Sequence, residues 1–254
     1  MRSLASAGYW VVGIEIDRPL KDRAETMLGR RGVVLLGDVR DRSALNEAAA
    51  TARRTAPLHG WVNNAGIESS GALHEVDATK LDGLLAVDLM AFVWGSQVAV
   101  RSFIDQRSTG SIVNISSLHG RVGYANWAGY DIAKGGVDAL TRYTAVEYGP
   151  VGIRANAVAP GSVRTEMHGR YIASTPRPEE TERGMASVVP LKRIAEPSEI
   201  ASVVTFLLSD AASYVTGQSL PVDGGFSAAG GVFAPHPDLV AQYGLRDETE
   251  EPAT

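Results

Sequence analysis

Hydrophobic residues in this chain fall into short continuous runs and into longer runs with helical spacing. The short runs are bounded by glycine or polar residues and predict buried strands over residues 9–16, 33–36, 60–63, 112–115, 153–158 and 219–222. The longer runs predict helices over residues 20–28, 41–55, 78–107, 129–148 and 197–209. Residues 1–7 are typical of the end of a further helix, which Gly8 would stop. Strands and helices therefore alternate along the chain.

The stretch from Ser111 to Lys134 carries the clearest chemical pattern. Tyr130 and Lys134 lie four residues apart at the start of a predicted helix, so their side chains share one face. A phenol ordinarily titrates near ~10, and a nearby cation favours its ionised form. Ser117 ends the preceding strand, where its hydroxyl could hydrogen-bond a substrate oxygen whose proton Tyr130 exchanges. The alternative is a solvated pair on a helix face, and the serine at this spacing makes it the weaker reading.

The amino-acid composition limits the classes of protein to which this chain can belong. The chain has 254 residues, 44% of them hydrophobic, enough for one large core, which we expect over 1–226 with a flexible extension over 227–254. The net charge of −5 gives no reason to expect a nucleic acid or a membrane partner. Cysteine is absent, the histidines show no metal-ligand spacing, and no apolar run approaches the ~20 residues of a membrane span. We therefore expect a cytoplasmic protein without a metal site.

Four motifs together resemble the short-chain dehydrogenase/reductase family. They are the Ser117, Tyr130 and Lys134 set with G-x-I-V-N-I-S-S before it, Asn63-Asn64-Ala65-Gly66, the P-G-S-V-R-T of 160–165 and the V-D-G-G of 222–225. The resemblance runs from about Ala5 to Phe226. It implies an α/β fold with a Rossmann-like, doubly wound parallel sheet and helices on both faces. It also implies an NAD(P)-dependent oxidoreductase that interconverts a secondary alcohol and a ketone.

The same resemblance implies a set of cofactor-binding residues. An acidic residue at the position of Glu15 would bind the adenosine ribose and repel a 2′-phosphate, which favours NAD over NADP. Asp17 is a rival for that role, and Arg18 could soften the preference. The other positions that match are Asp38, Val39, Asn64, Ala65, Gly66, Tyr130, Lys134, Pro160, Gly161, Val163 and Thr165.

Catalytic roles follow from the resemblance in the same way. Tyr130 would exchange the proton, Ser117 would orient the substrate oxygen, and Lys134 would lower the pKa of the tyrosine and bind the nicotinamide ribose. Asp88 is a fourth catalytic candidate. It stands where the family usually carries an asparagine of a proton relay, and it keeps the backbone carbonyl and one acceptor oxygen but loses the amide donor.

The sequence also predicts the kind of substrate and the association of subunits. The expected substrate wall includes Ser117, His119, Trp127 and Met167, with Trp94 behind them. These aromatic residues suggest an apolar small-molecule alcohol or ketone. The polar stretch 162–194 predicts a segment that covers the substrate. Family members usually associate through the two long helices, so a homotetramer or homodimer is expected.

One family feature has no counterpart in this sequence. The first predicted strand matches the second strand of the family, and no G-x-x-x-G-x-G turn occurs to hold a pyrophosphate. Three explanations remain open: a longer working protein, a truncated chain, or a loss of cofactor binding. The alternative function is therefore a catalytically degenerate scaffold or interaction subunit with weak or no cofactor binding.

Overall fold

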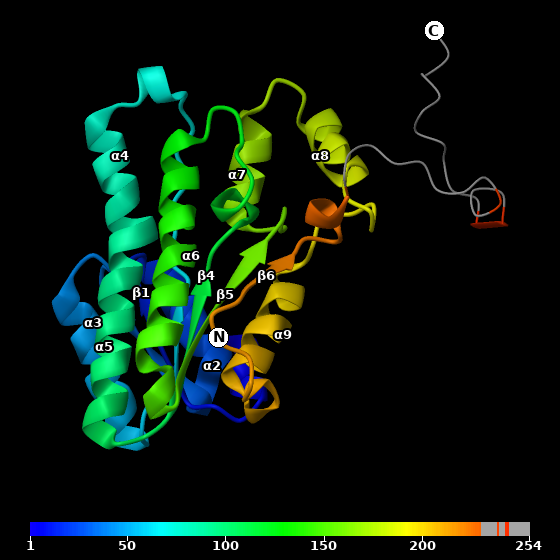
Figure 1. The fold of residues 1–254 in the computed structure, drawn as a ribbon. Helices are drawn as coiled ribbons and strands as arrows, with labels where there is room; N and C mark the ends of the chain where they lie inside the picture. The colour runs from blue at the N-terminus through cyan, green and yellow to red at the C-terminus, as the bar shows by residue number, and fades with distance from the viewer. Residues whose placement is uncertain (230–237, 239–241, 244–254) are drawn as a thin grey trace, which may run out of the picture.

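The computed structural model describes residues 1–229, 238 and 242–243, and its strands are parallel (Figure 1). Part of the predicted extension, 230–254 apart from those three residues, therefore lies outside the described residues. The strands form two groups. One pairs β1 (Val11–Glu15) with β2 (Gly32–Leu36), and the other has the order β3 (Gly60–Asn63), β4 (Gly110–Ile115), β5 (Ile153–Pro160), β6 (Ser219–Val222). Parallel strands separated by helices confirm the predicted α/β fold.

The helices follow the predicted pattern closely. They are α1 (Arg2–Ser6), α2 (Arg18–Leu28), α3 (Arg42–Thr55), α4 (Ala78–Leu85), α5 (Ala91–Gln106), α6 (Ala128–Tyr148), α7 (Glu166–Ser174), α8 (Pro178–Ser187) and α9 (Pro197–Leu208). Helix α2 begins before the predicted residue 20 because the side chain of Asp17 caps it, accepting the Leu20 N–H at 2.8 Å. The polar stretch 162–194 holds α7 and α8.

Helices cover both faces of the larger group of strands, as predicted. Successive side chains of a strand point to opposite faces. In β4, Ile112 packs in a cluster with Ala99 and Phe103 of α5, whereas Val113 packs in another with Leu207 of α9. Figure 1 shows α5 and α6 side by side, with α9 across the strands from them.

The long predicted helix forms as one continuous stretch, Ala78–Gln106, with a π-helical segment (Ala86–Met90) between α4 and α5. Within the described residues it is the one helix long and apolar enough to cross a membrane, which differs from the prediction that no apolar run approaches that length. Half of its apolar stretch is buried inside the fold. A core helix has the same length and composition, so this one is weak evidence for a membrane span. The π-helical segment brings Asp88 into the interior, fully buried.

Strands β1 and β3 are not paired with each other among residues 1–229, so the sheet is divided between them. Leu4 of α1 packs against the apolar clusters on both sides of this division. The side chain of Met1 lies against β1, since a Cβ added to Gly13 would lie 2.7 Å from the Met1 sulfur. An N-terminal helical turn thus links the two groups of strands by packing.

Candidate active site

The carboxyl ends of parallel strands place most of the predicted cofactor residues along one edge of the fold. Glu15 ends β1, and Asp38 and Val39 follow β2. Asn64, Ala65 and Gly66 follow β3. Pro160 ends β5, and Gly161 comes directly after it. Ser117 lies two residues after β4, at the same edge.

Tyr130 and Ser117 are brought together at this edge. Tyr130 lies in the first turn of α6, close enough to Ser117 for the serine hydroxyl to act on the pKa of the phenol. The Ser117 hydroxyl oxygen also accepts the backbone N–H of His119 at 3.3 Å. The serine and the tyrosine are therefore within reach of one substrate oxygen.

Lys134 is buried one helical turn further along α6, in contact with Asp88. Its ammonium lies 3.0 Å from the Oδ2 atom of Asp88 and donates to the carbonyl of Ile115 at 3.3 Å. The Oδ1 atom of Asp88 accepts the backbone N–H of Ile67 at 2.8 Å. Oδ2 has no hydrogen-bond partner of good geometry among the described residues. The pair is thus a charge contact in which the carboxylate neutralises the lysine.

The electrostatics of Tyr130 differ from the sequence prediction that Lys134 lowers its pKa. Burial raises the pKa of Tyr130 well above its ordinary value, and the charge of Asp88 raises it further. The nearby hydroxyl of Ser117 acts in the opposite direction and lowers this pKa. The ammonium of Lys134 lies 5.3 Å from the centre of the tyrosine ring, but Asp88 balances its charge. The prediction that Lys134 lowers this pKa is wrong for the protein without a bound cofactor, because burial and the charge of Asp88 raise it.

Aromatic side chains from the loop before α6 surround the ring of Tyr130. The imidazole of His119 stacks on Tyr124, with 4.0 Å between ring centroids, and meets the Tyr130 ring edge-on at 4.9 Å. Trp127 meets the rings of His119 and Tyr130 at 5.4 and 6.0 Å. The predicted substrate residues His119 and Trp127 therefore share one cluster with Tyr130.

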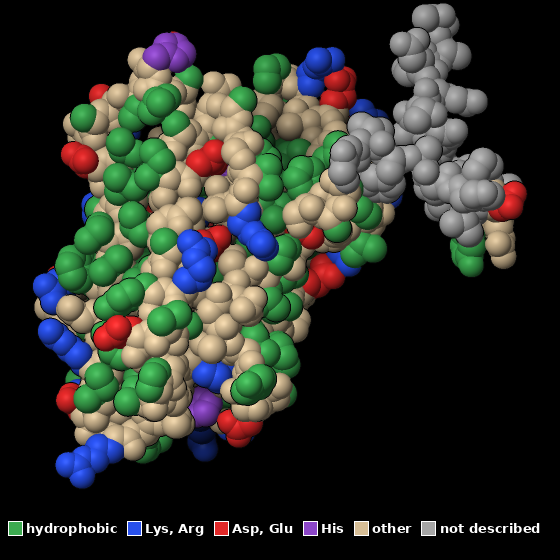
Figure 2. All heavy atoms as spheres, in the orientation of Figure 1, with side chains coloured by type: hydrophobic (Ala, Val, Ile, Leu, Met, Phe, Trp, Pro, Cys, Tyr) green, Lys and Arg blue, Asp and Glu red, His purple; other side chains and the backbone are tan. Residues whose placement is uncertain are grey.

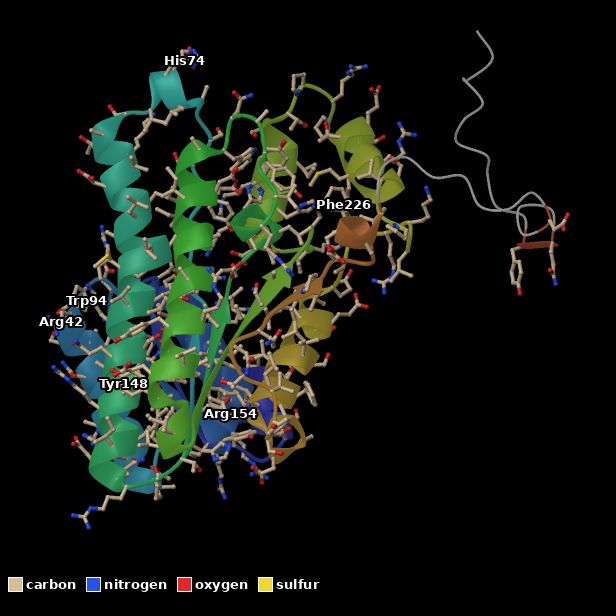
Figure 3. The ribbon with its side chains drawn as sticks, in the orientation of Figure 1. Arg42, His74, Trp94, Tyr148, Arg154 and Phe226 are labelled. Carbon is tan, nitrogen blue, oxygen red and sulfur yellow. The ribbon has the colours of Figure 1, made fainter. Side chains whose placement is uncertain are left out.

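Met167 and Trp94 were also predicted to form the substrate wall, and only Met167 lies near the aromatic cluster. Met167 is partly buried in the first turn of α7, where Tyr171, one turn later, contacts Trp127 at 5.9 Å between ring centroids. Trp94 instead packs toward α3, with the Arg42 guanidinium 4.5 Å from its ring centroid (Figure 3). Trp94 therefore belongs to the contact between α3 and α5, and the prediction that it backs the substrate wall was wrong.

Several of the residues predicted to hold a dinucleotide have structural partners along the strand edge. Glu15 accepts the Asp17 N–H at 3.0 Å, and the Arg40 guanidinium holds the pKa of Asp38 below its ordinary value. Val39 packs in an apolar cluster. A Cβ on Gly66 would lie 3.0 Å from Oδ2 of Asp88, so the turn after β3 leaves no room for a side chain there.

The later part of this edge is built by loops. Val163 pairs with Ala195 in an isolated parallel bridge, and Thr165 caps α7 by accepting the His168 N–H at 3.1 Å. A Cβ on Gly161 would lie 3.1 Å from Cα of Asp223. Among the described residues, no group of three or more His, Asp or Glu side chains is arranged to hold a metal ion.

Sequence reasoning missed three residues near Tyr130. Asp131 bonds His119, Tyr171 contacts Trp127, and the charge of Glu68 contributes to the raised pKa of Tyr130. The spacing of Tyr171 from Met167 on one helical face could have indicated its place. Nothing in the sequence pattern indicated the other two.

The fold and the site define a Rossmann-like α/β oxidoreductase. The sequence model of a family described as enoyl-(acyl carrier protein) reductase matches residues 1–227. The chain is 38% identical to 2-(S)-hydroxypropyl-CoM dehydrogenase 3 of Xanthobacter autotrophicus over 226 residues, 87% of this chain and 88% of the relative. It is 36% identical to the inactive 2-(S)-hydroxypropyl-CoM dehydrogenase 2 of the same organism over 228 residues, 89% of this chain and 99% of that protein.

Solved structures give the same result. A crystal structure of levodione reductase superposes with a TM-score of 0.84 at 33% identity, covering 90% of this chain and 93% of that one. The chain belongs to the short-chain dehydrogenase/reductase family, as the sequence motifs predicted. It is therefore a member of an enzyme class that acts on CH–OH groups with a nicotinamide cofactor.

Proposed function

We propose that this protein interconverts a secondary alcohol and a ketone at Ser117, Tyr130 and Lys134, with NAD as the cofactor. The observation that carries the proposal is the closeness of the Ser117 and Tyr130 hydroxyls at the strand edge, with the Lys134 ammonium one helical turn away. The dehydrogenase and reductase relatives support it. A small-molecule alcohol or ketone is the proposed partner.

The residues of the site divide the chemistry as follows. When bound, the nicotinamide supplies the hydride acceptor or donor. In the oxidative direction the Tyr130 oxygen takes the proton of the substrate hydroxyl, and the Ser117 hydroxyl holds the same substrate oxygen in place. Lys134 would reach the nicotinamide ribose. Its ammonium is held between the Asp88 carboxylate and the Ile115 carbonyl.

Glu15 supports the preference for NAD over NADP. It is partly buried at the carboxyl end of β1, where its carboxylate is available to ribose hydroxyls and repels a 2′-phosphate. The remaining dinucleotide contacts are proposed for Asp38, Val39, Asn64, Ala65, Gly66, Pro160, Gly161, Val163 and Thr165. Titration with NADH and with NADPH tests this, and the account predicts tighter binding of NADH.

A degenerate scaffold is the second candidate function. Two observations favour it: Asp88 neutralises Lys134 beside a tyrosine of raised pKa, and one relative is described as inactive. The NADH titration separates the candidates. Saturable binding supports the oxidoreductase, whereas no binding at millimolar NADH supports the scaffold.

We further propose that copies of this chain associate into a homotetramer or homodimer through α5 and α6. Apolar side chains on these helices are exposed, namely Ile104, Ile132, Tyr143 and Val146. Figure 2 shows hydrophobic side chains spread over the face where α5 and α6 lie. A second copy would remove this apolar surface from water.

A further inference from the structure

His119 and Asp131 form a hydrogen-bonded pair directly beside Tyr130. The Nδ1 atom of His119 lies 2.6 Å from Oδ1 of Asp131, and both side chains are largely buried. The second carboxylate oxygen of Asp131 accepts the backbone N–H of Tyr124 at 2.9 Å. A carboxylate that accepts at both oxygens leaves the proton on Nδ1 of the imidazole. Asp131 therefore selects the Nδ1–H tautomer of His119.

The imidazole is fixed in position as well as in tautomer. Its ring stacks on Tyr124 with an interplanar angle of 21° and meets Trp127 and Tyr130 edge-on. The Nδ1 bond to Asp131 prevents the ring from turning over. No hydrogen-bond partner of the other ring nitrogen, Nε2, occurs in the described part of the chain, and Nε2 is not sealed from solvent. The ring thus offers one unused nitrogen next to the proposed proton-transfer group.

Burial determines whether Nε2 of His119 accepts or donates a hydrogen bond at neutral pH. Burial lowers the pKa of His119 below its ordinary value, and the carboxylate of Asp131 only partly offsets this. A neutral imidazole with its proton on Nδ1 has a lone pair on Nε2 and accepts a hydrogen bond there. An anionic substrate group would need a donor at this position, so a hydroxyl donor fits better than a carboxylate.

We infer that His119, held by Asp131, accepts a hydrogen bond from a second hydroxyl of the substrate, adjacent to the carbinol that reacts. This inference rests on the proposed function for the location of the reacting oxygen. That oxygen lies between Ser117 and Tyr130, and the backbone N–H of His119 donates to the Ser117 hydroxyl oxygen at 3.3 Å. The imidazole, with its centroid 4.9 Å from that of the Tyr130 ring, would then face the carbon next to the one that reacts. The substrate class is a vicinal diol or polyol, or the matching hydroxyketone, in place of the purely apolar substrate predicted from the aromatic residues.

The tautomer is tested without turnover. In the full chain labelled with ¹⁵N-histidine, NMR reports which ring nitrogen carries the proton, and His119→Phe identifies the signal of His119 among the five histidines. The inference predicts a proton on Nδ1 and a bare Nε2 at neutral pH, with a shift of the Nε2 signal on addition of butane-2,3-diol and none with butan-2-ol. A protonated Nε2 in the wild type, or equal response to both alcohols, would overturn it.

Turnover gives the second readout, as the ratio of kcat/KM for butane-2,3-diol to that for butan-2-ol. Losing one hydrogen bond between neutral groups should lower this ratio about tenfold in His119→Phe. Asp131→Asn keeps the volume and an acceptor for Tyr124, but its amide would donate to Nδ1 and move the proton to Nε2. In this variant the substrate hydroxyl would have to accept from Nε2–H instead of donating to Nε2, so the ratio should fall by less than in His119→Phe. The variant serves if His119→Phe fails to fold.

The two readouts separate the inference from the function on which it rests. An unchanged ratio in both variants, in an enzyme that turns over both alcohols, contradicts the role of His119. Absence of turnover with either alcohol contradicts the proposed function. In that case the tautomer and the diol-dependent shift still decide whether His119 recognises the second hydroxyl.

Discussion

Asp88 is the residue whose charge most clearly sets this active site apart from the pattern of its family. Its carboxylate is fully buried, contacts Lys134 at 3.0 Å and raises the pKa of Tyr130. The family usually has an asparagine here, which would leave the lysine charge unbalanced. The geometry therefore gives Asp88 a positioning role toward Lys134 and a direct influence on the titration of the tyrosine.

Replacing Asp88 by asparagine should move the pH profile of alcohol oxidation to lower pH. The folded-state pKa of Tyr130 is raised, so the phenolate that accepts the proton is scarce near neutral pH and increases with pH. Removing the Asp88 charge leaves the lysine unbalanced and takes away one of the causes that raise this pKa, so the pKa should fall. Oxidation at pH 8 should then rise, by about tenfold for each pH unit that the profile moves, because the ionised fraction changes tenfold per pH unit well below the pKa.

The exposed Asp82 on α4 provides the matched control. Asp82→Asn makes the same chemical change away from the tyrosine and should leave the profile in place. A profile of Asp88→Asn that coincides with the wild type would show that the carboxylate does not control Tyr130. Loss of stability alone would lower the amount of active enzyme without shifting the profile.

At the scale of elements, a buried polar network fixes two strands against the helix that carries Tyr130. Asn63 of β3 donates to Asn114 of β4 at 2.7 Å, and Asn114 donates to Thr141 of α6 at 2.9 Å. The side chain of Asn63 also accepts the Trp61 indole N–H at 2.7 Å and donates to Ser96 of α5 at 3.0 Å. The network couples β4, which leads to Ser117, with the helix of Tyr130 and Lys134.

Thr141→Val should lower the free energy of unfolding by about 1–3 kcal/mol, because the amide of Asn114 would be left buried without an acceptor. Thr144→Val is the matched control on the same helix, since the Thr144 hydroxyl donates to the Leu140 carbonyl of its own helix. The control should cost less than Thr141→Val, because it leaves no buried amide without an acceptor. Urea denaturation measures both variants, and equal effects would argue against the network.

At the scale of the whole molecule, the apolar surface of α5 and α6 bears on assembly. Val146 is 79% exposed and Tyr143 is 59% exposed on α6. If copies of the chain associate there, Val146→Glu would bury a charge and should release smaller species in sedimentation velocity. Val188→Glu, at the end of α8, makes the same change away from this surface and should leave assembly intact. A monomeric wild type would contradict the proposal.

The sequence predicted the parts of this molecule that depend on local pattern. Strand 60–63 and the helix that places Tyr130 and Lys134 on one face formed as expected, because hydrophobic periodicity and helical spacing determine them. The family motifs added the Ser117 and Tyr130 contact.

What the sequence could not predict depends on contacts between distant residues. Lys134 pairs with Asp88 only because the π-helical segment is packed beside α6, and Trp94 faces α3 because of the rotation of its helix. The His119 and Asp131 pair needs the loop before α6 to fold back on the first helical turn. Burial raises the pKa of Tyr130, where a lowered pKa was expected. The spacing of residues along the sequence does not show how deeply a side chain is buried.

Turnover of a secondary alcohol by the wild type and by Tyr130→Phe is the most direct test of the proposed chemistry. The variant removes one oxygen atom and keeps the ring that packs on His119 and Trp127. The account predicts that the wild type reduces NAD⁺ with the alcohol, and that Tyr130→Phe loses this turnover by a factor on the order of 10² to 10⁴ while still binding NADH. Wild-type turnover in Tyr130→Phe would contradict the account.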